Sequence, residues 1–346
     1  MYQARFKEIT LKFGFPAGTS RGVLYEKKSW FLILQDNQHY GIGECSLIPG
    51  LSPDNSECCI SKIDELCRFI NEGKDPGEFD LSGYPSISFG LETALSDLRN
   101  QGTKILFPSL FTLGKEGIDI NGLIWMGSET FMIDQIKNKT QSGFSCLKLK
   151  IGAIDFESEV NLIKKVRNEF PDLEIRLDAN GAFAVSDALA KIEILSKYTI
   201  HSLEQPVRPG NWKSIAEICS KSPIPIALDE ELIGIYDYPE KEKMLRLINP
   251  KYIILKPGLL GGLKASAEWI GLAAENGTGW WVTSALESNI GLNAIAQWTC
   301  TLGNKMVQGL GTGQIYENNI PSPLTIREGK LFYDTGKNWD TKDILE

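Results

Sequence analysis

The sequence has few of the side chains on which histidine or thiol chemistry depends. Its 346 residues include only two histidines, His39 and His201, and seven cysteines that show no CxxC spacing. A Ser–His pair or a histidine base therefore has little to draw on, and a zinc or redox site is not indicated. An odd number of cysteines in a chain of this length indicates reduced, mostly buried thiols, so we expect a cytoplasmic protein.

Long apolar runs and clusters of positive charge are also missing. No run of about 18 apolar residues occurs, and residues 1–15 lack the apolar core of a secretory signal, so we expect no membrane span. The net charge is −8, whereas nucleic acids and anionic membranes reward clustered Lys and Arg. We therefore expect a small-molecule partner, with no nucleic acid and no membrane; a homo-oligomer is compatible with the sequence.

Residues 1–117 have the pattern of an α+β lobe. Strand-like stretches near 3–13, 30–35 and 39–45 precede helical patterns around 54–72 and 88–102. Residues 36–38 form a predicted hairpin turn between the last two strands. Two Gly- and Pro-containing segments, 14–22 and 47–53, are predicted as loops at the rim of a substrate pocket, and ordinary surface loops are the alternative for both.

From about residue 120 onward, short apolar strands alternate with amphipathic helices. One helix is predicted over 186–198, with Ser186 as its N-cap, and another over 262–277. Neither GxGxxG nor GxxxxGK[ST] occurs, which argues against an open nucleotide-binding sheet. The pattern predicts an α/β fold with a TIM-like barrel. The eight predicted strands cover residues 120–127, 145–152, 173–180, 200–206, 224–230, 252–258, 279–285 and 305–311.

Charged residues end many of these apolar strands, at the edge where barrel enzymes place their active sites. Any one of them could face solvent or cap the next helix, but their recurrence in successive units favours a joint site. Three carboxylates converging inside a barrel would repel strongly, and a divalent ion with oxygen ligands such as Mg²⁺ would offset that repulsion. The residues are Lys148, Lys150, Asp178, Glu204, Asp229 and Lys256.

The lysines predict acid–base chemistry beside this metal site. An ammonium has an ordinary pKa of about 10.4, and a neighbouring ammonium and a metal ion would lower that of Lys150 enough for a general base. Lys148 is its neighbour, and Lys256 would reach the site from the opposite face. Such a site suits abstraction of a proton α to a carboxylate. A non-catalytic barrel that binds a small acid through its metal is the alternative of another class, but it has no reason to keep three lysines.

As a set, these residues resemble the motifs of the enolase superfamily, and within it the muconate-lactonizing subgroup. The resemblance covers nearly the whole chain and implies a (β/α)7β barrel over residues 118–315, beneath a capping domain over 1–117 to which 316–346 return. It also implies Mg²⁺ bound by Asp178, Glu204 and Asp229, with an acid–base lysine on each face. The motifs are K-L-K at 148–150, D-A-N at 178–180, E-Q-P at 204–206, D-E at 229–230 and K-P-G at 256–258.

The subgroup includes o-succinylbenzoate synthases, N-acylamino acid racemases, dipeptide epimerases and muconate cycloisomerases, all of which begin by α-proton abstraction. The segment T-S-A-L-E-S at 283–288 resembles the Ser-rich stretch of the synthases, which implies that Ser284 binds substrate, and N-G-L-I-W at 121–125 also resembles them. Dipeptide epimerases typically carry Asp-x-Asp at the end of the eighth strand, where this chain has G-L-G-T-G at 309–313. Asn180, Gly311 and Thr312 are further expected substrate contacts.

The resemblance therefore implies a lyase of menaquinone biosynthesis that dehydrates 2-succinyl-6-hydroxy-2,4-cyclohexadiene-1-carboxylate to o-succinylbenzoate. The racemase and the dipeptide epimerase, which use the same two-lysine metal site, are the alternatives. Arg176 resembles an arginine of some synthases, and either contact with substrate or pairing with a carboxylate would explain it.

Overall fold

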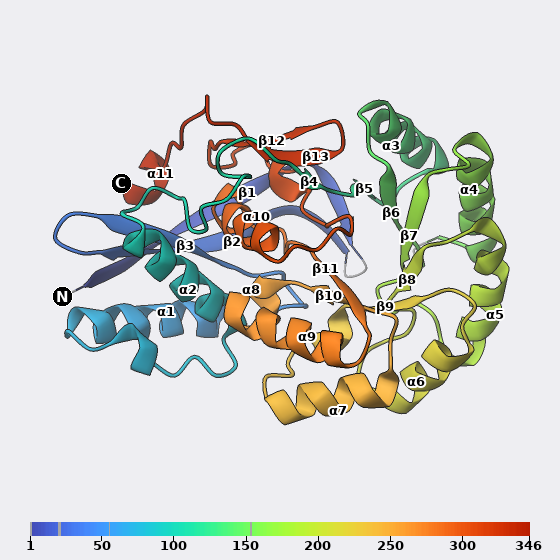
Figure 1. Cartoon of the computed structure of the whole chain (residues 1–346), viewed down its shortest axis with the longest axis horizontal. Coiled ribbons are helices and arrows are strands. Elements are labelled where there is room, and N and C mark those ends of the chain that lie inside the picture. The colour runs from blue at the N-terminus through green and yellow to red at the C-terminus, as the bar shows by residue number, and fades with distance from the viewer. Residues whose placement is uncertain (1, 20–21, 55, 153) are drawn as a thin grey trace.

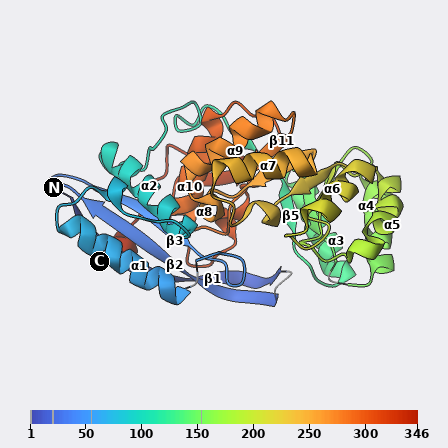
Figure 2. The same ribbon diagram turned by 90° about the horizontal axis from the view of Figure 1, so that it is seen from below.

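The computed structural model describes residues 2–19, 22–54, 56–152 and 154–346. Two parts lie side by side in Figure 1: an antiparallel sheet with helices α1 and α2 at one end, and a curled parallel sheet with helices around its outside at the other. Figure 2 shows the same division from below, with β1, β2 and α1 at one end and α3–α6 at the other. No helix in the described residues is long and apolar enough to cross a membrane.

The antiparallel sheet has the order β1-β2-β3. Its strands are β1 (Gln3–Thr19), β2 (Gly22–Gln35) and β3 (Tyr40–Ser46). The predicted turn between β2 and β3 is confirmed: a carboxylate oxygen of Asp36 accepts the backbone N–H groups of Gln38 at 2.8 Å and His39 at 2.7 Å. An Asp that bonds to the backbone two residues on is a usual way to close such a turn.

The predicted loop over residues 14–22 is wrong where the structure describes it. Strand β1 continues through this segment to Thr19, and β2 begins at Gly22; Ser20 and Arg21 lie outside the described residues. The register between the two strands shifts between Lys12 and Ala17. Proline cannot donate to a ladder but is tolerated at a bulge, so Pro16 sits at this irregularity without ending the strand.

Two helices, α1 (Ser56–Asn71) and α2 (Pro85–Arg99), pack on the antiparallel sheet, and a short 3-10 turn, η1 (Pro76–Glu78), lies between them. Strand β3 and helix α2 meet through glycines: a Cβ on Gly43 would lie 1.8 Å from the carbonyl oxygen of Gly90. Side chains such as Leu32, Leu34 and Ile63 fill the interface and are fully buried. Glycine is therefore needed at residue 43, where the backbones of β3 and α2 approach each other closely.

The parallel sheet has the order β5-β6-β7-β8-β9-β10-β11, so each strand pairs with the next one in the chain. Seven of the eight predicted strands are confirmed as strands. The eighth appears as two isolated parallel bridges, Ile120 with Gln308 and Thr283 with Gly309, which connect that segment to the beginning of β5 and the end of β11. The strands are β5 (Gly122–Ile124), β6 (Cys146–Lys150), β7 (Glu174–Asp178), β8 (Ser202–Glu204), β9 (Ile226–Leu228), β10 (Tyr252–Leu255) and β11 (Gly279–Val282).

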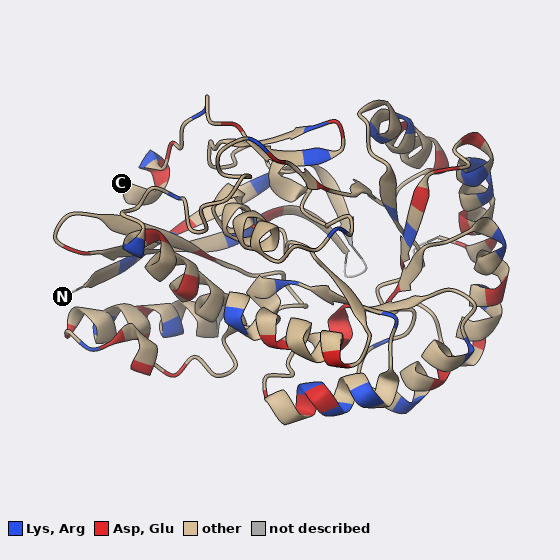
Figure 3. Ribbon diagram, in the orientation of Figure 1, with Lys and Arg blue, Asp and Glu red and all other residues tan. Residues whose placement is uncertain are grey.

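Helices connect these strands and cover the outside of the sheet (Figure 1). Charged residues of both signs are interspersed along the outer helices (Figure 3). Ser186 is not an N-cap, because the extended residue before the helix is Ala184. The helices are α3 (Glu129–Gln141), α4 (Phe156–Glu169), α5 (Val185–Leu195), α6 (Trp212–Lys221), α7 (Tyr238–Ile248), α8 (Pro257–Leu260), α9 (Leu263–Glu275) and α10 (Asn289–Thr301), with 3-10 turns η2 (Ser196–Tyr198), η3 (Glu230–Leu232) and η4 (Thr312–Gln314).

The last residues of the chain return towards its beginning. Strands β12 (Leu324–Arg327) and β13 (Lys330–Tyr333) form a small sheet with β4 (Ile118–Asp119). The final helix, α11 (Lys342–Leu345), buries Ile344 against Phe31 and Ile33 of β2.

Candidate active site

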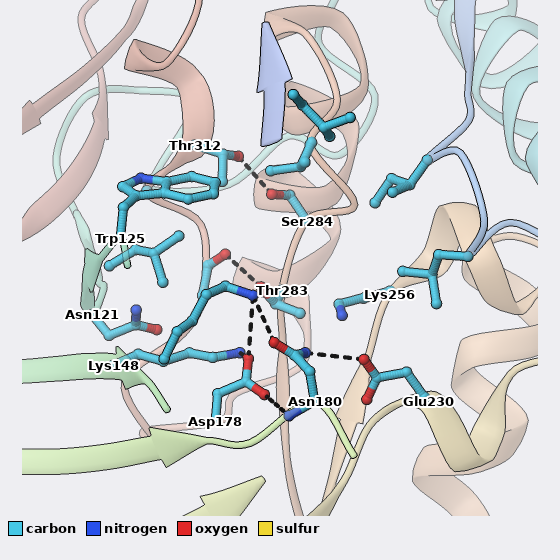
Figure 4. A pocket seen from close by; sticks show the side chains of 18 of the residues that line it. Asn121, Trp125, Lys148, Asp178, Asn180, Glu230, Lys256, Thr283, Ser284 and Thr312 are labelled. Carbon is cyan, nitrogen blue, oxygen red and sulfur yellow. Dashed lines mark hydrogen bonds and ion pairs between the residues drawn. The ribbon is translucent and has the colours of Figure 1, made fainter. Parts of the chain in front are cut away.

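A pocket lies at the carboxyl ends of the parallel strands, and most of the predicted site residues line it (Figure 4). The exceptions are Glu204 and Asp229, which are buried behind it against the predicted lysines. The lining residues that the sequence predicted are Lys148, Lys150, Asp178, Asn180, Lys256, Ser284, Gly311 and Thr312.

Lys148 lies between two of the predicted metal ligands. Its Nζ is 2.9 Å from Oδ2 of Asp178 and 2.7 Å from Oε1 of Glu204. The strand register explains the contact, because Lys148 lies on β6 two residues before its end, and Asp178 and Glu204 are paired on β7 and β8. Side chains two apart on a strand point to the same face, so all three groups enter the same interior.

Lys150 ends the same strand and faces the pocket. Its Nζ donates a hydrogen bond to Oδ1 of Asn180 at 2.8 Å and is 3.8 Å from Oδ2 of Asp178. Asn180 has a positive φ of 41°. Its backbone N–H donates to Oδ1 of Asp178 and its side-chain amide donates to Oε1 of Glu230, each at 3.0 Å. Asn180 therefore places the Lys150 ammonium relative to two carboxylates; Figure 4 shows Asn180 between Asp178 and Glu230.

Lys256 follows β10 and forms an ion pair with Oδ2 of Asp229. In Figure 4 it enters from the side opposite Lys148, with Asp178 and Asn180 between them. The loop that carries Asp229 is held by the side-chain oxygen of Gln205, which accepts the backbone N–H groups of Asp229 at 3.3 Å and Glu231 at 3.2 Å. The glutamine of the E-Q-P motif therefore fixes the segment that follows β9.

The buried charges perturb one another. Burial lowers the pKa of Lys150, and the ammonium groups of Lys148 and Lys256 lower it further, although Asp178 opposes them. Burial also disfavours a charge on Lys148, but Asp178 and Glu204 outweigh it and raise the pKa of that lysine. The pKa of Glu204 is raised well above its ordinary value by burial and by Asp178. Opposite charges favour, and like charges disfavour, the ionised form.

The far wall of the pocket comes from the segments after β11 and around residue 310. The hydroxyls of Ser284 and Thr312 are 2.5 Å apart and form a hydrogen bond. Thr283 donates its hydroxyl to the carbonyl of Gly309 at 2.8 Å. The strand bridge between these segments thus brings the predicted substrate contacts Ser284 and Thr312 together, and both line the pocket with Gly311.

The rim is largely apolar. Ile48, Pro49 and Leu51 line the pocket, as the predicted rim segment 47–53 requires. Two more rim residues, Leu24 of β2 and Leu286, pack in one apolar cluster with Trp125 and Phe15 of β1. The long hairpin of β1 and β2 therefore reaches the pocket, although it does so as a hairpin and not as an irregular loop.

Comparison with known proteins identifies the family of this chain. The family model described as "Enolase C-terminal domain-like" matches residues 132–337. The o-succinylbenzoate synthase of Desulfotalea psychrophila is 46% identical over 94% of this chain and 97% of its own length. The chain belongs to the enolase superfamily.

Solved structures of the superfamily have the same fold. The crystal structure of MenC from Desulfotalea psychrophila has a TM-score of 0.86 and 41% identity, with 96% of this chain and 99% of that chain covered. A dipeptide epimerase from Enterococcus faecalis, solved with Mg and the dipeptide L-Leu-L-Tyr, has a TM-score of 0.80 and 19% identity, with 97% of both chains covered.

The predicted ligand set has residue types that suit Mg²⁺, which members of the superfamily use, but its carboxylates are paired with lysines in this structure. Asp178, Glu204 and Asp229 are each at most 2% exposed and lie at the ends of three adjacent strands. Lysines pair with all three, and no group of three His, Cys, Asp or Glu side chains in the described part of the chain is arranged to hold a metal ion. The residue types still suit a hard divalent cation, because they offer several carboxylate oxygens in a buried, electronegative site.

Several lining residues were not predicted as site residues. Glu230 is the second residue of the D-E motif, and Asn121 and Trp125 lie in the segment 121–125, so the sequence marked their segments but not their roles. Trp281 lines the pocket from inside β11.

The sequence left the role of Arg176 open. Its Cζ atom lies over the ring of Trp281, 4.3 Å from the ring centroid. It also pairs with Glu174 at 2.8 Å. It is not among the residues that line the pocket, so the described structure favours pairing with a carboxylate.

Proposed function

We propose that this protein is an o-succinylbenzoate synthase of menaquinone biosynthesis, which dehydrates 2-succinyl-6-hydroxy-2,4-cyclohexadiene-1-carboxylate. The observation that carries the proposal is the relative of that name, 46% identical over 94% of the chain, combined with a pocket that contains the lysines of β6 and the lysine that follows β10. Fold-level likeness alone would not identify the substrate, because one fold hosts many activities.

The finer architecture is part of the same proposal. The parallel bridges at Gln308 and Gly309 support a closed (β/α)7β barrel, because they connect both edges of the seven-stranded sheet. We assign the barrel to residues 118–315, the capping domain to 1–117, and the returning segment to 316–346. The active site would then lie where barrel enzymes place it, at the carboxyl ends of the strands under the cap.

The reaction needs a base for the α-proton and positive charge for the enediolate that results. Lys150 is assigned as the base, because its Nζ is at the pocket surface and is held by Asn180. Lys256, which lies across the pocket, would stabilise the negative charge on the substrate carboxylate. Protonated Lys150 would then give its proton to the departing hydroxyl, which leaves as water while the C–O bond breaks and the ring becomes aromatic.

Asp178, Glu204 and Asp229 would hold Mg²⁺, and when bound this ion would supply a Lewis acid for the substrate carboxylate. Lys148 lies between Asp178 and Glu204, and its ammonium lowers the pKa of the base, Lys150. Ser284, Thr312, Asn180 and Gly311 are assigned to substrate binding. The apolar rim would receive the ring and the methylene groups of the succinyl tail.

No observation favours the racemase or the epimerase over the synthase. The segment Gly309–Gly313 lacks the Asp-x-Asp that holds the ammonium group of dipeptide substrates. A charged ammonium in this pocket would face the lysines and lack that partner.

The test is turnover of the cyclohexadiene carboxylate by Lys150→Met and Lys256→Met. General acid–base catalysis contributes about 10²- to 10⁴-fold, so Lys150→Met should lose at least that much in kcat. Loss of one group that stabilises developing charge costs about 10²- to 10³-fold, which is the loss expected for Lys256→Met. Both variants should keep their fold. Lys251→Met is the matched control, because Lys251 is exposed at the opposite end of β10. Chelation of divalent ions should stop turnover reversibly. Full activity of either pocket variant, or of the chelated protein, would overturn the proposal.

A further inference from the structure

A second group of buried charges lies outside the proposed catalytic machinery, between the antiparallel sheet and the wall of the pocket. It consists of Lys27 on β2, Glu44 on β3 and Glu287 in the connection between β11 and α10. Lys27 is 3% exposed, and both glutamates are fully buried. Charges are rarely buried so completely unless they are paired, so this cluster needs an explanation.

Glu44 crosses from the antiparallel sheet to the beginning of helix α10. Its Oε1 accepts hydrogen bonds from the backbone N–H of Ser288 at 2.9 Å and from the hydroxyl of Ser29 at 2.8 Å. Its Oε2 accepts from the Ser288 hydroxyl at 2.6 Å and from the backbone N–H of Gly291 at 3.0 Å. A carboxylate at this position also complements the positive end of the helix.

Glu287 holds the segment that lines the pocket. Its Oε2 accepts the backbone N–H of Ala285 at 2.6 Å. Its Oε1 has no hydrogen-bond partner among the described residues and lies against α8, where a Cβ on Gly258 would be only 2.8 Å away. Glu287 therefore fills the space between two segments of the pocket: the one that follows Ser284 and the one that follows Lys256.

Lys27 supplies the positive charge for both glutamates. Its Nζ donates to the hydroxyls of Ser29 at 3.0 Å and Ser46 at 2.5 Å. The Ser29 hydroxyl in turn donates a hydrogen bond to Glu44. Burial lowers the pKa of Lys27, whereas Glu44 and Glu287 oppose that change. Loss of this ammonium would leave Glu44, and Glu287 above its pKa of about 7, without a buried counter-charge.

The segment held by this cluster is part of the pocket wall. Thr283, Ser284 and Leu286 line the pocket. Leu286 has a φ of 58°, a conformation that costs a non-glycine residue energy and persists only where the surroundings enforce it. The hydroxyl of Tyr316 also donates to the carbonyl of Leu286 at 2.7 Å.

We propose that Lys27, Glu44 and Glu287 form a positioning network. Through this network the antiparallel sheet holds residues 283–288 in the geometry that binds substrate. The inference deepens the proposed synthase function and rests on it for its kinetic test. Helix α2 is also attached to the beginning of α9, at a place that does not reach the pocket. Glu92 of α2 accepts the backbone N–H groups of Leu263 and Lys264 at 2.6 and 3.1 Å, without lining the pocket.

The test compares Lys27→Met, Glu287→Gln and the double variant in steady-state kinetics. Lys27→Met should raise KM by about tenfold, the scale of coupling between contacting residues, with a smaller effect on kcat. At pH 8, above the pKa of Glu287, the double variant should recover most of this loss, because it has no carboxylate at residue 287 that could ionise without the ammonium. Lys28→Met is the control on β2, because Lys28 is exposed and pairs with Glu8 at the surface. Glu92→Gln controls for attachment and should lower Tm without changing KM.

A second measurement does not depend on the substrate. Hydrogen exchange at the amides of Ala285 and Ser288, which donate to Glu287 and Glu44, should become faster in Lys27→Met and not in Glu92→Gln. Unchanged KM and unchanged exchange would overturn the network. If the wild-type protein does not turn over the proposed substrate, the proposed function fails, and the exchange rates still decide the network. If Lys27→Met does not fold, Glu287→Gln, which keeps the side-chain shape, decides it by the same two readouts.

Discussion

The ionisation of Glu287 should make the stability of this protein depend on pH in a direction that the structure specifies. Burial raises the pKa of Glu287 from its ordinary value of 4.5 to about 7, and the neighbouring Glu44 contributes to the increase. Lys27, Tyr316 and Cys45 also interact electrostatically with this cluster. The pKa of Tyr316 is raised well above its ordinary value by burial, so its hydroxyl stays protonated at neutral pH.

The sign follows from proton binding. The folded protein keeps the Glu287 proton up to about pH 7, whereas the unfolded chain releases it near pH 4.5. The stabilisation is therefore complete below pH 4.5 and is lost as the pH rises through 7. One pKa unit corresponds to about 1.4 kcal/mol, so the free energy of unfolding should fall by about 3 kcal/mol across this range. Other groups also titrate in this range. A variant that differs only at residue 287 contains the same groups, so their contribution cancels when the two proteins are compared.

Glu287→Gln isolates the contribution, because glutamine has nearly the same shape and no proton to release. Urea unfolding of both proteins should be followed by tryptophan fluorescence at intervals between pH 4.5 and 8. The wild-type free energy of unfolding should fall relative to that of the variant by about 3 kcal/mol as the pH rises. Parallel curves for the two proteins would refute the reasoning, since they would show that Glu287 ionises alike in the folded and unfolded states.

Two further predictions concern stability. Lys148→Met should lower the free energy of unfolding by about 3–5 kcal/mol in urea titrations without divalent ions, because it leaves Asp178 and Glu204 buried without their ammonium. Added Mg²⁺ should restore part of the loss. An unchanged midpoint of unfolding would contradict the charge pairing. Gly43→Ala should destabilise by at least about 1–3 kcal/mol, because its Cβ would overlap the backbone of α2. Gly271→Ala in α9 is the control, since nothing lies within 4 Å of that Cβ, and it should be neutral or stabilising.

The strand ends could be predicted from the sequence because two local signals coincide there. A short apolar run ends in a charged residue, and the alternation of strands with helices places all such ends at one edge. The structure accordingly places Lys148, Lys150, Asp178 and Lys256 around one pocket. The partners of each lysine could not be predicted, because they depend on the register between neighbouring strands and on side-chain reach.

The hairpin of β1 and β2 shows where local signals mislead. Gly14, Pro16 and Gly18 are typical of a loop, but Gly18 pairs with Val23 of β2 and Gly14 donates to the carbonyl of Ile315. The register shift between Lys12 and Ala17 accommodates the proline. The cluster around Glu44 was beyond reach for a different reason. Its bonds to Ser288 join residues 244 positions apart, and no periodicity within either segment indicates that contact.

The charges around the pocket explain why binding of the metal and binding of the substrate would depend on each other. A bound cation would favour the ionised form of every carboxylate, including Glu204 and Glu230, whose pKa values burial raises without it. Three ammonium groups then face four carboxylates, which leaves one net negative charge from the side chains. The groups are Lys148, Lys150, Lys256, Asp178, Glu204, Asp229 and Glu230. That balance favours a divalent cation. With the cation bound the net charge becomes positive by one, and a substrate carboxylate restores neutrality. Because charge imbalance is costly where water is excluded, substrate affinity should depend on the metal even before any chemistry occurs.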